Sequence, residues 1–130
     1  MSEQQDTHRV FVIGLDGATF ALLRPWLENG ELPCLSRLYR EGVSGVLNSV
    51  IPPLSPEAWS TFMTGKHPGH HGVMNFVTLR PGSYELSFNT GASVQQRTLW
   101  RMLSDSGRSV GVVGVPMTYP PEPVNGYLVS

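Results

Sequence analysis

The sequence predicts an α/β fold in which a layered parallel sheet is flanked by helices. Short apolar runs at 9–14, 43–50 and 109–114 are typical of strands, and helical stripes of apolar residues lie between them. Glycine and proline are abundant, with 14 and 11 residues, as expected for an enzyme-like domain with many shaped loops. Alternating strands and helices form right-handed βαβ units, and 130 residues suffice for about one domain.

The overall charge and the single cysteine restrict the partners and the compartment. A formal net charge of −1 gives no broad attraction to nucleic acid or to an anionic membrane. Cys34 is the only cysteine, so no intrachain disulfide forms and a reducing compartment fits. Residues 1–8 are polar and lack the apolar segment of a signal peptide, so we expect a disordered leader. We therefore expect a cytoplasmic protein without nucleic-acid or membrane partners, and of no specified oligomeric state.

The first apolar run ends at a carboxylate. Both faces of Arg9–Gly14 are apolar, as in a central parallel strand, and Asp16 follows at its carboxyl end. Ligands of open α/β sheets gather at that edge, so Asp16 is a candidate site residue. A simple Asp-Gly turn with Gly17 is the alternative.

Two helices and a second strand should follow. Thr19 is the best candidate for an N-cap, and the helix after it should end at Gly30 and be kinked or split by Pro25. A second short helix is expected from Pro33 to Gly42. Residues 43–50 alternate weakly and are predicted to form the second strand.

The most informative stretch is 51–72. Ser55 stands where an N-cap belongs, followed by Pro56 and Glu57 in a first helical turn. The helix should end at Gly65 and turn one apolar face inward, formed by Ala58, Trp59, Phe62 and Met63. A hydroxyl at the positive end of a helix is well placed to meet phosphate or sulfate, although Ser-Pro-Glu alone is more typical of a structural cap.

The remaining chain should add an arm, a helix and a third strand. Residues 73–79 and 84–88 are expected to form an arm over the sheet, and Ser93 is expected to cap a helix that ends at Gly107. The proline-rich loop 115–123 comes after the strand 109–114 and should face the same crevice as Asp16 and Ser55. Because an apolar strand begins at 127 just before the chain stops, we expect the N-terminal piece of a longer protein.

Together these motifs carry a family resemblance. Leu15-Asp16-Gly17 is followed about forty residues later by Pro-Pro-Leu-Ser-Pro-x-Ala-Trp-Ser-Thr-Phe-x-Thr-Gly-Lys-x-Pro-x-x-His-Gly, and later by Trp100-x-Met-Leu-x-x-x-Gly107. From Arg9 on, the chain resembles the type I phosphodiesterase/nucleotide pyrophosphatase family of the alkaline phosphatase superfamily, and in particular its microbial branch. The resemblance implies that 9–130 is the incomplete N-terminal part of an alkaline-phosphatase-like catalytic domain.

The resemblance also implies a chemistry. It implies two divalent metal ions, usually zinc, and a small-molecule phosphoester as substrate. Asp16 matches the family's first metal-binding aspartate, and Ser55, ten residues before Gly65, matches the nucleophile, whose oxygen also binds metal. Ser55 would then form a phosphoseryl intermediate that water activated by zinc hydrolyses.

Two departures from the family pattern limit the inference of substrate and activity. Eukaryotic members have an asparagine three residues after the nucleophile, where this chain has Ala58, so the substrate class does not transfer. Asp16 and Ser55 are also too few ligands for one tetrahedral zinc, so we expect this piece alone to be inactive. His67, His70 and His71 match no familiar ligand spacing; a structural contact is the simpler role for His71.

Two other functions stay open at this point. The chain could be a non-catalytic scaffold or binding piece that keeps the fold without the chemistry. A sugar-kinase or actin-like ATP site is a weaker alternative, suggested by Gly-Leu-Asp-Gly-Ala-Thr at 14–19. That site needs a hairpin strand where a helical stripe begins at Phe20.

Overall fold

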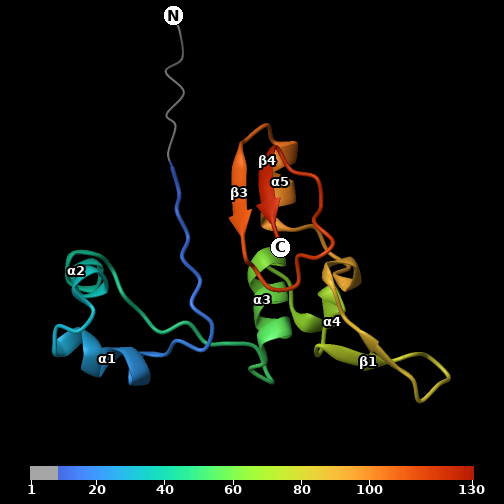
Figure 1. The fold of residues 1–130 in the computed structure, drawn as a ribbon, viewed down its shortest axis with the longest axis horizontal. Helices are drawn as coiled ribbons and strands as arrows, with labels where there is room; N and C mark the ends of the chain where they lie inside the picture. Colours follow the sequence, from blue (N-terminus) through green and yellow to red (C-terminus); the bar gives the residue numbers. More distant parts are fainter. Residues whose placement is uncertain (1–8) are drawn as a thin grey trace, which may run out of the picture.

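The computed structural model describes residues 9–130, so the expected leader at 1–8 lies outside the described residues. Helices and short strands alternate along this part of the chain, with the later elements gathered into one body (Figure 1). In chain order the elements are α1 (Phe20–Glu28), α2 (Pro33–Glu41), α3 (Ser55–Thr64), α4 (Pro68–His71), β1 (Val77–Leu79), β2 (Leu86–Phe88), the 3-10 helix η1 (Gly91–Ser93), α5 (Leu99–Asp105), β3 (Val110–Val113) and β4 (Gly126–Val129).

The parallel part of the predicted sheet is present as one strand pair. β3 and β4 pair in parallel, with Val112 opposite Leu128, and the predicted strand at 109–114 is thereby confirmed. Strand β3 is short and mostly apolar. Helix α5 precedes it in the chain and packs against it. The described residues therefore combine helices with small sheets, an arrangement compatible with an α/β fold.

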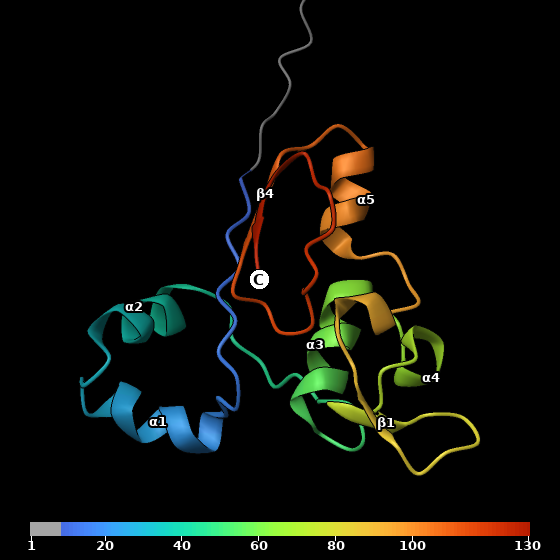
Figure 2. The ribbon, with the colours of Figure 1, turned by 45° about the vertical axis from the view of Figure 1, so that its right-hand side comes forward.

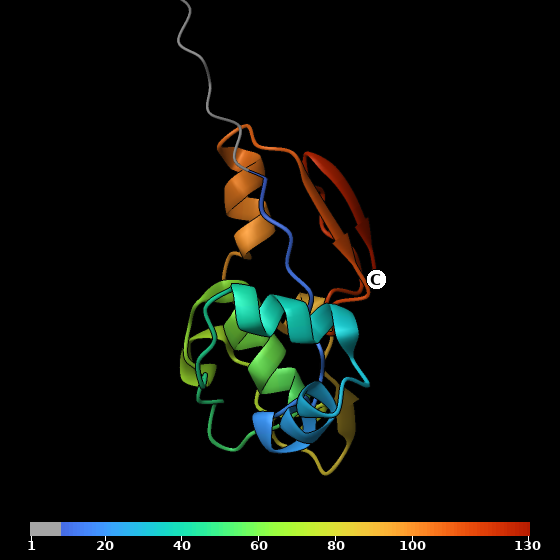
Figure 3. The same ribbon diagram turned by 90° about the vertical axis from the view of Figure 1, so that its left-hand side faces the viewer.

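The other two predicted strands are wrong. Residues 9–14 and 43–50 carry no strand pairing, and Figure 3 shows 9–14 as an extended chain that does not join β3 and β4. The side chains of Val10 and Phe11 are 84% and 89% exposed. A buried parallel strand needs paired neighbours and covering layers on both faces, and β3 has only β4 as a partner within residues 9–130.

The helices α1 and α2 form a pair set off from the rest of the molecule (Figures 1 and 2). The predicted cap is confirmed, because Thr19 Oγ1 accepts the amide N–H of Leu22 at 3.3 Å. Pro25 does not split α1, which runs on to Glu28. α2 begins at Pro33 and is capped by Gly42, as the sequence predicts.

The side of helix α3 that faces inward is not the predicted one. It ends as expected at Gly65, whose left-handed φ of 64° suits glycine. However, Phe62 is 46% exposed, whereas Glu57 and Ser60 are fully buried beside Met63. The inward face of α3 is thus partly polar, which a pattern of apolar spacing cannot reveal.

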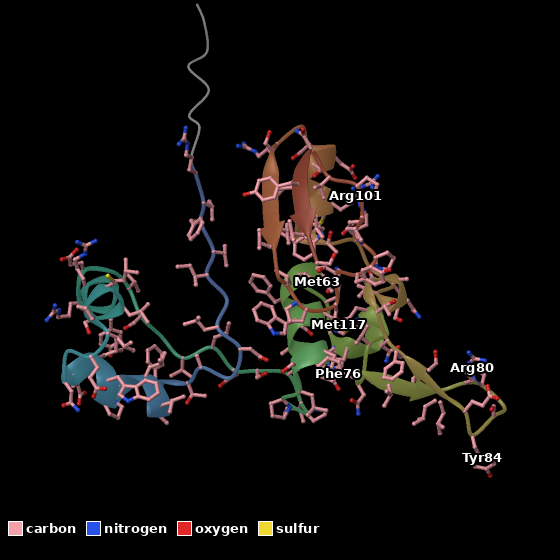
Figure 4. The ribbon with its side chains drawn as sticks, viewed as in Figure 1. Met63, Phe76, Arg80, Tyr84, Arg101 and Met117 are labelled. Carbon is pink, nitrogen blue, oxygen red and sulfur yellow. The ribbon has the colours of Figure 1, made fainter. Side chains whose placement is uncertain are left out.

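The arm is a short antiparallel hairpin. β1 pairs with β2, with Thr78 opposite Ser87, and Figure 4 shows Arg80 and Tyr84 at its far end. The helix after the arm begins later than predicted. Ser93 closes η1 and accepts the Thr90 amide N–H, whereas Thr98 caps α5 by accepting the N–H of Arg101.

A small core joins the later elements. Met63 of α3, Trp100 of α5 and Val112 of β3 are buried together, and the partly buried residues around them include Met117 and Leu128. Met117, in the loop after β3, has a φ of 64°, uncommon for a residue other than glycine. Within residues 9–130, none of the helices has both the length and the apolar character needed to cross a bilayer.

Candidate active site

The two predicted site residues, 39 positions apart in the sequence, meet in the structure. The Ser55 hydroxyl donates to the Asp16 carboxylate, with Oγ 3.0 Å from Oδ2 and 3.2 Å from Oδ1. Asp16 is exposed and Ser55 is half-buried, so both oxygens lie at the molecular surface. A hydroxyl that donates to a carboxylate is held in one orientation and keeps its lone pairs available.

Ser55 does not act as the helix cap that its sequence context suggests. Leu54 holds the N-cap position, Ser55 begins α3, and the N-cap of α3 has no side-chain hydrogen bond. Pro56 next to it has no amide N–H to be capped. The hydroxyl is therefore free of the usual structural role, and it lies at the positive end of α3, where negative charge is stabilised.

A close contact between Gly14 and Trp59 aligns the extended segment with α3. A Cβ added to Gly14 would lie 2.3 Å from Cη2 of Trp59, so only glycine lets the indole approach so closely. Ser55 and Trp59 are four residues apart and share one face of α3, separated by about 6 Å of helical rise. Two residues of extended chain span about 6.6 Å, so Asp16 meets Ser55 when Gly14 meets Trp59.

The buried side of α3 carries polar atoms without partners. Both carboxylate oxygens of Glu57 and the hydroxyl of Ser60 are buried and have no hydrogen-bond partner within the described residues. Glu57 lies in the first turn of α3, as predicted, but its carboxylate is fully covered. It is therefore not accessible to a substrate.

His71 is a structural contact within this region. Its ring is fully buried; Nδ1 accepts the Val73 amide N–H at 3.2 Å, and Nε2 lies 3.1 Å from the Thr61 hydroxyl. The accepting Nδ1 fixes the neutral tautomer with hydrogen on Nε2. Burial, and secondarily the charge of His67, lower the pKa of His71 below its ordinary value of 6.5. His67 and His70 are exposed.

The oxygen donors at Ser55 and Asp16 suit part of a metal site. A carboxylate and a hydroxyl oxygen are both ligands for divalent ions, and both lie at the surface. Within residues 9–130, no group of three or more histidine, cysteine, aspartate or glutamate side chains gathers to hold an ion. The pair therefore fits as a portion of a coordination sphere that needs about four ligands.

The predicted position of the proline-rich loop is not the one observed. Residues of this loop between 117 and 122 line a cavity together with Met63 and Trp100, and neither Asp16 nor Ser55 lines it. Met63 lies near the carboxyl end of α3, whereas Ser55 begins the helix. Sequence reasoning also missed the Gly14–Trp59 contact, for which the only signal was a glycine at the end of an apolar run.

Comparison with known proteins identifies the class of protein. Residues 10–128 match the family described as type I phosphodiesterase / nucleotide pyrophosphatase. The chain therefore belongs to this family. Members of the family are generally metal-dependent, and membership suggests a phosphodiesterase or pyrophosphatase function. Comparisons with curated proteins and with solved structures gave no match.

Proposed function

We propose that this chain carries the nucleophile and one metal ligand of a phosphoester hydrolase. Ser55 is the proposed nucleophile, and Asp16 and Ser55 are the proposed metal-binding residues. The single observation that supports this assignment is the 3.0 Å contact between the Ser55 hydroxyl and the Asp16 carboxylate at the start of α3. Family membership supplies the reaction class.

The proposed reaction has two displacement steps. Ser55 Oγ attacks phosphorus, the bond from phosphorus to the leaving oxygen breaks, and a phosphoseryl group forms. The Ser55 proton, which is hydrogen-bonded to Asp16 Oδ2 before the attack, is released to solvent water. Water then attacks the phosphoseryl group, which returns the hydroxyl and releases the phosphoryl product. The positive end of α3 favours the negative charge that gathers at phosphorus in both steps.

Divalent ions belong to the same proposal. Two ions, zinc being the first candidate, would be held in part by the Asp16 carboxylate and the Ser55 oxygen. When bound, such ions lower the pKa of coordinated hydroxyl and water groups and neutralise phosphate charge. Because this pair supplies too few ligands, we expect the 130-residue chain alone to show little turnover.

The substrate is proposed at the level of its chemical class. Family membership supports a small-molecule phosphoester, and the net charge of −1 gives no reason to propose nucleic acid. Ala58 cannot donate a side-chain hydrogen bond to phosphoryl oxygens, so those oxygens need another donor. The lone, exposed thiol of Cys34 suits the reducing cytoplasm proposed as the location.

Stoichiometric labelling tests the proposal without requiring turnover. The chain would be incubated with zinc and a nitrophenyl phosphate ester, and the protein mass and phosphorylated position determined by mass spectrometry. We expect one phosphoryl group on Ser55, absent in Ser55→Ala and retained in Ser44→Ala, an exposed serine outside the site. Zinc titration should show weaker binding for Asp16→Asn.

Two outcomes would contradict the proposal, and a third would contradict one part of it. Label on another residue, or label unaffected by Ser55→Ala, would exclude Ser55 as nucleophile. Absence of both label and zinc binding would favour a non-catalytic scaffold. Steady turnover by the isolated chain that is abolished by Ser55→Ala would support the nucleophile but overturn the expected dependence on further ligands.

A further inference from the structure

A cavity near the carboxyl end of α3, which neither Asp16 nor Ser55 lines, has its own ligand chemistry. It has a volume of about 270 Å³ and lies between α3, η1, the start of α5 and the loop after β3. Its walls are largely apolar and include Met63, Met117, Trp100 and Pro120. Figure 4 shows Met63 on α3 and Met117 on the loop after β3.

Among the described residues, one carboxylate is the only ionisable group that lines this cavity. Glu122 Oε1 accepts the Thr98 hydroxyl at 2.5 Å and the Trp100 indole N–H at 2.6 Å. Thr98 and Trp100 are both buried, so these two donors fix the carboxylate from the protein side. Hydrogen bonds donated to a carboxylate hold it in one orientation.

Glu122 has no cationic partner within residues 9–130. The nearby arginines, Arg97 and Arg101, line an adjoining recess that Glu122 also borders, and both are paired with Asp105. The two arginines share that one carboxylate, and neither forms a salt bridge with Glu122 or lines the cavity itself. A part-buried carboxylate is normally matched by a direct ion pair, and no basic side chain of the described residues lines the cavity to form one with Glu122.

We propose that this cavity binds a small organic cation, of the alkylammonium class. The ammonium group would pair with Glu122, and the apolar body would contact the methionine and proline walls. The Trp100 indole, which lines the same cavity, attracts cations through its ring face. An apolar cavity of about 150 Å³ holds benzene, so this volume suits a small ligand of about ten heavy atoms rather than a nucleotide.

The test compares a cation with a neutral molecule of similar shape. Tetramethylammonium and tert-butyl alcohol would be titrated into the 130-residue chain, with the Trp100 indole N–H resonance as the readout. We expect saturable shifts from the cation, with a dissociation constant of about 1 mM, and at least about tenfold weaker binding of the alcohol.

A charge-removing variant provides the second comparison. Glu122→Gln keeps an oxygen that can accept from Thr98 and Trp100 but removes the charge, and we expect cation binding to weaken about tenfold. Glu85→Gln, at an exposed hairpin residue paired with Arg80, is the matched control and should bind as the parent does. Equal binding of cation and alcohol to the parent chain, no saturable shift, or unchanged cation binding in folded Glu122→Gln would each overturn the proposal. If Glu122→Gln does not fold, the cation–alcohol comparison decides alone.

Discussion

Adding one methyl group at Gly14 should disturb the candidate active site without touching Ser55 or Asp16. In Gly14→Ala the new Cβ would lie 2.3 Å from Trp59 Cη2, and carbon atoms in contact need about 3.5 Å. The segment and the indole must therefore separate by about 1 Å. Trp59 also makes an edge-on contact with Phe62, with ring centroids 5.9 Å apart, whereas the segment has no strand pairing, so we expect the segment to move.

The size of the effect is set by these distances. A displacement of about 1 Å would lengthen the Ser55–Asp16 contact from 3.0 Å to about 4 Å, beyond hydrogen-bond range. Overpacking commonly lowers the free energy of unfolding by about 1–3 kcal/mol. Alanine also restricts the unfolded chain more than glycine does, which offsets about 0.4–1 kcal/mol of that loss. This offset applies because the φ of Gly14 is not left-handed, so alanine can adopt it. We expect a net destabilisation of about 1–2 kcal/mol.

Denaturant unfolding monitored by circular dichroism measures this change, with Gly45→Ala as the matched control. No atom lies within 4 Å of a Cβ added at Gly45, so that variant should differ from the parent by less than about 0.5 kcal/mol. Trp59→Leu removes the atoms that clash and should reduce the cost of Gly14→Ala. The reasoning is refuted if Gly14→Ala and Gly45→Ala behave alike, or if Trp59→Leu leaves the cost unchanged.

Two further predictions concern the buried residues around α3. The lowered pKa of His71 means that the unfolded chain binds its proton first, so stability should be full above about pH 6.5 and fall on acidification until the folded ring also titrates. Unfolding midpoints between about pH 7.5 and pH 5 measure this slope, which His71→Asn should reduce and His70→Asn should not. Glu57→Leu should raise the free energy of unfolding by about 1–3 kcal/mol, because it removes a fully buried carboxylate without partners in the described chain. Unchanged or lower stability in chemical denaturation would contradict that account.

Local signals in the sequence predicted several boundaries well. Thr19, Gly42, Gly65 and Gly107 each act through the few residues beside them, by capping a helix or by allowing a left-handed turn. The strand at 110–113 was also predictable, because its apolar run is bounded by glycine and polar residues. Asp16 and Ser55 were expected to meet at one edge of a parallel sheet; the two residues do meet, but no strand precedes Asp16 within residues 9–130, so the sheet edge is not what brings them together.

The failures concern interactions between distant parts of the chain. An apolar run such as 10–13 forms a strand only when partners and covering layers are available, and the run itself does not specify them. Burial of Glu57 depends on what packs against α3, which helical spacing does not encode. The position of loop 115–123 depends on Glu122 meeting Thr98 and Trp100, a contact with no signature in sequence spacing.

The Ser55–Asp16 contact also constrains the covalent stage of the proposed reaction. A phosphoryl group on Ser55 would place a charge of about −2 next to the Asp16 carboxylate. Anions so close repel each other unless a positive ion stands between them, and the hydroxyl proton that now joins the two residues would be gone. The extended segment at 14–16 would then either share a counter-ion with the modified serine or be pushed away from α3, so the two stages of the reaction would differ in how firmly this segment is held.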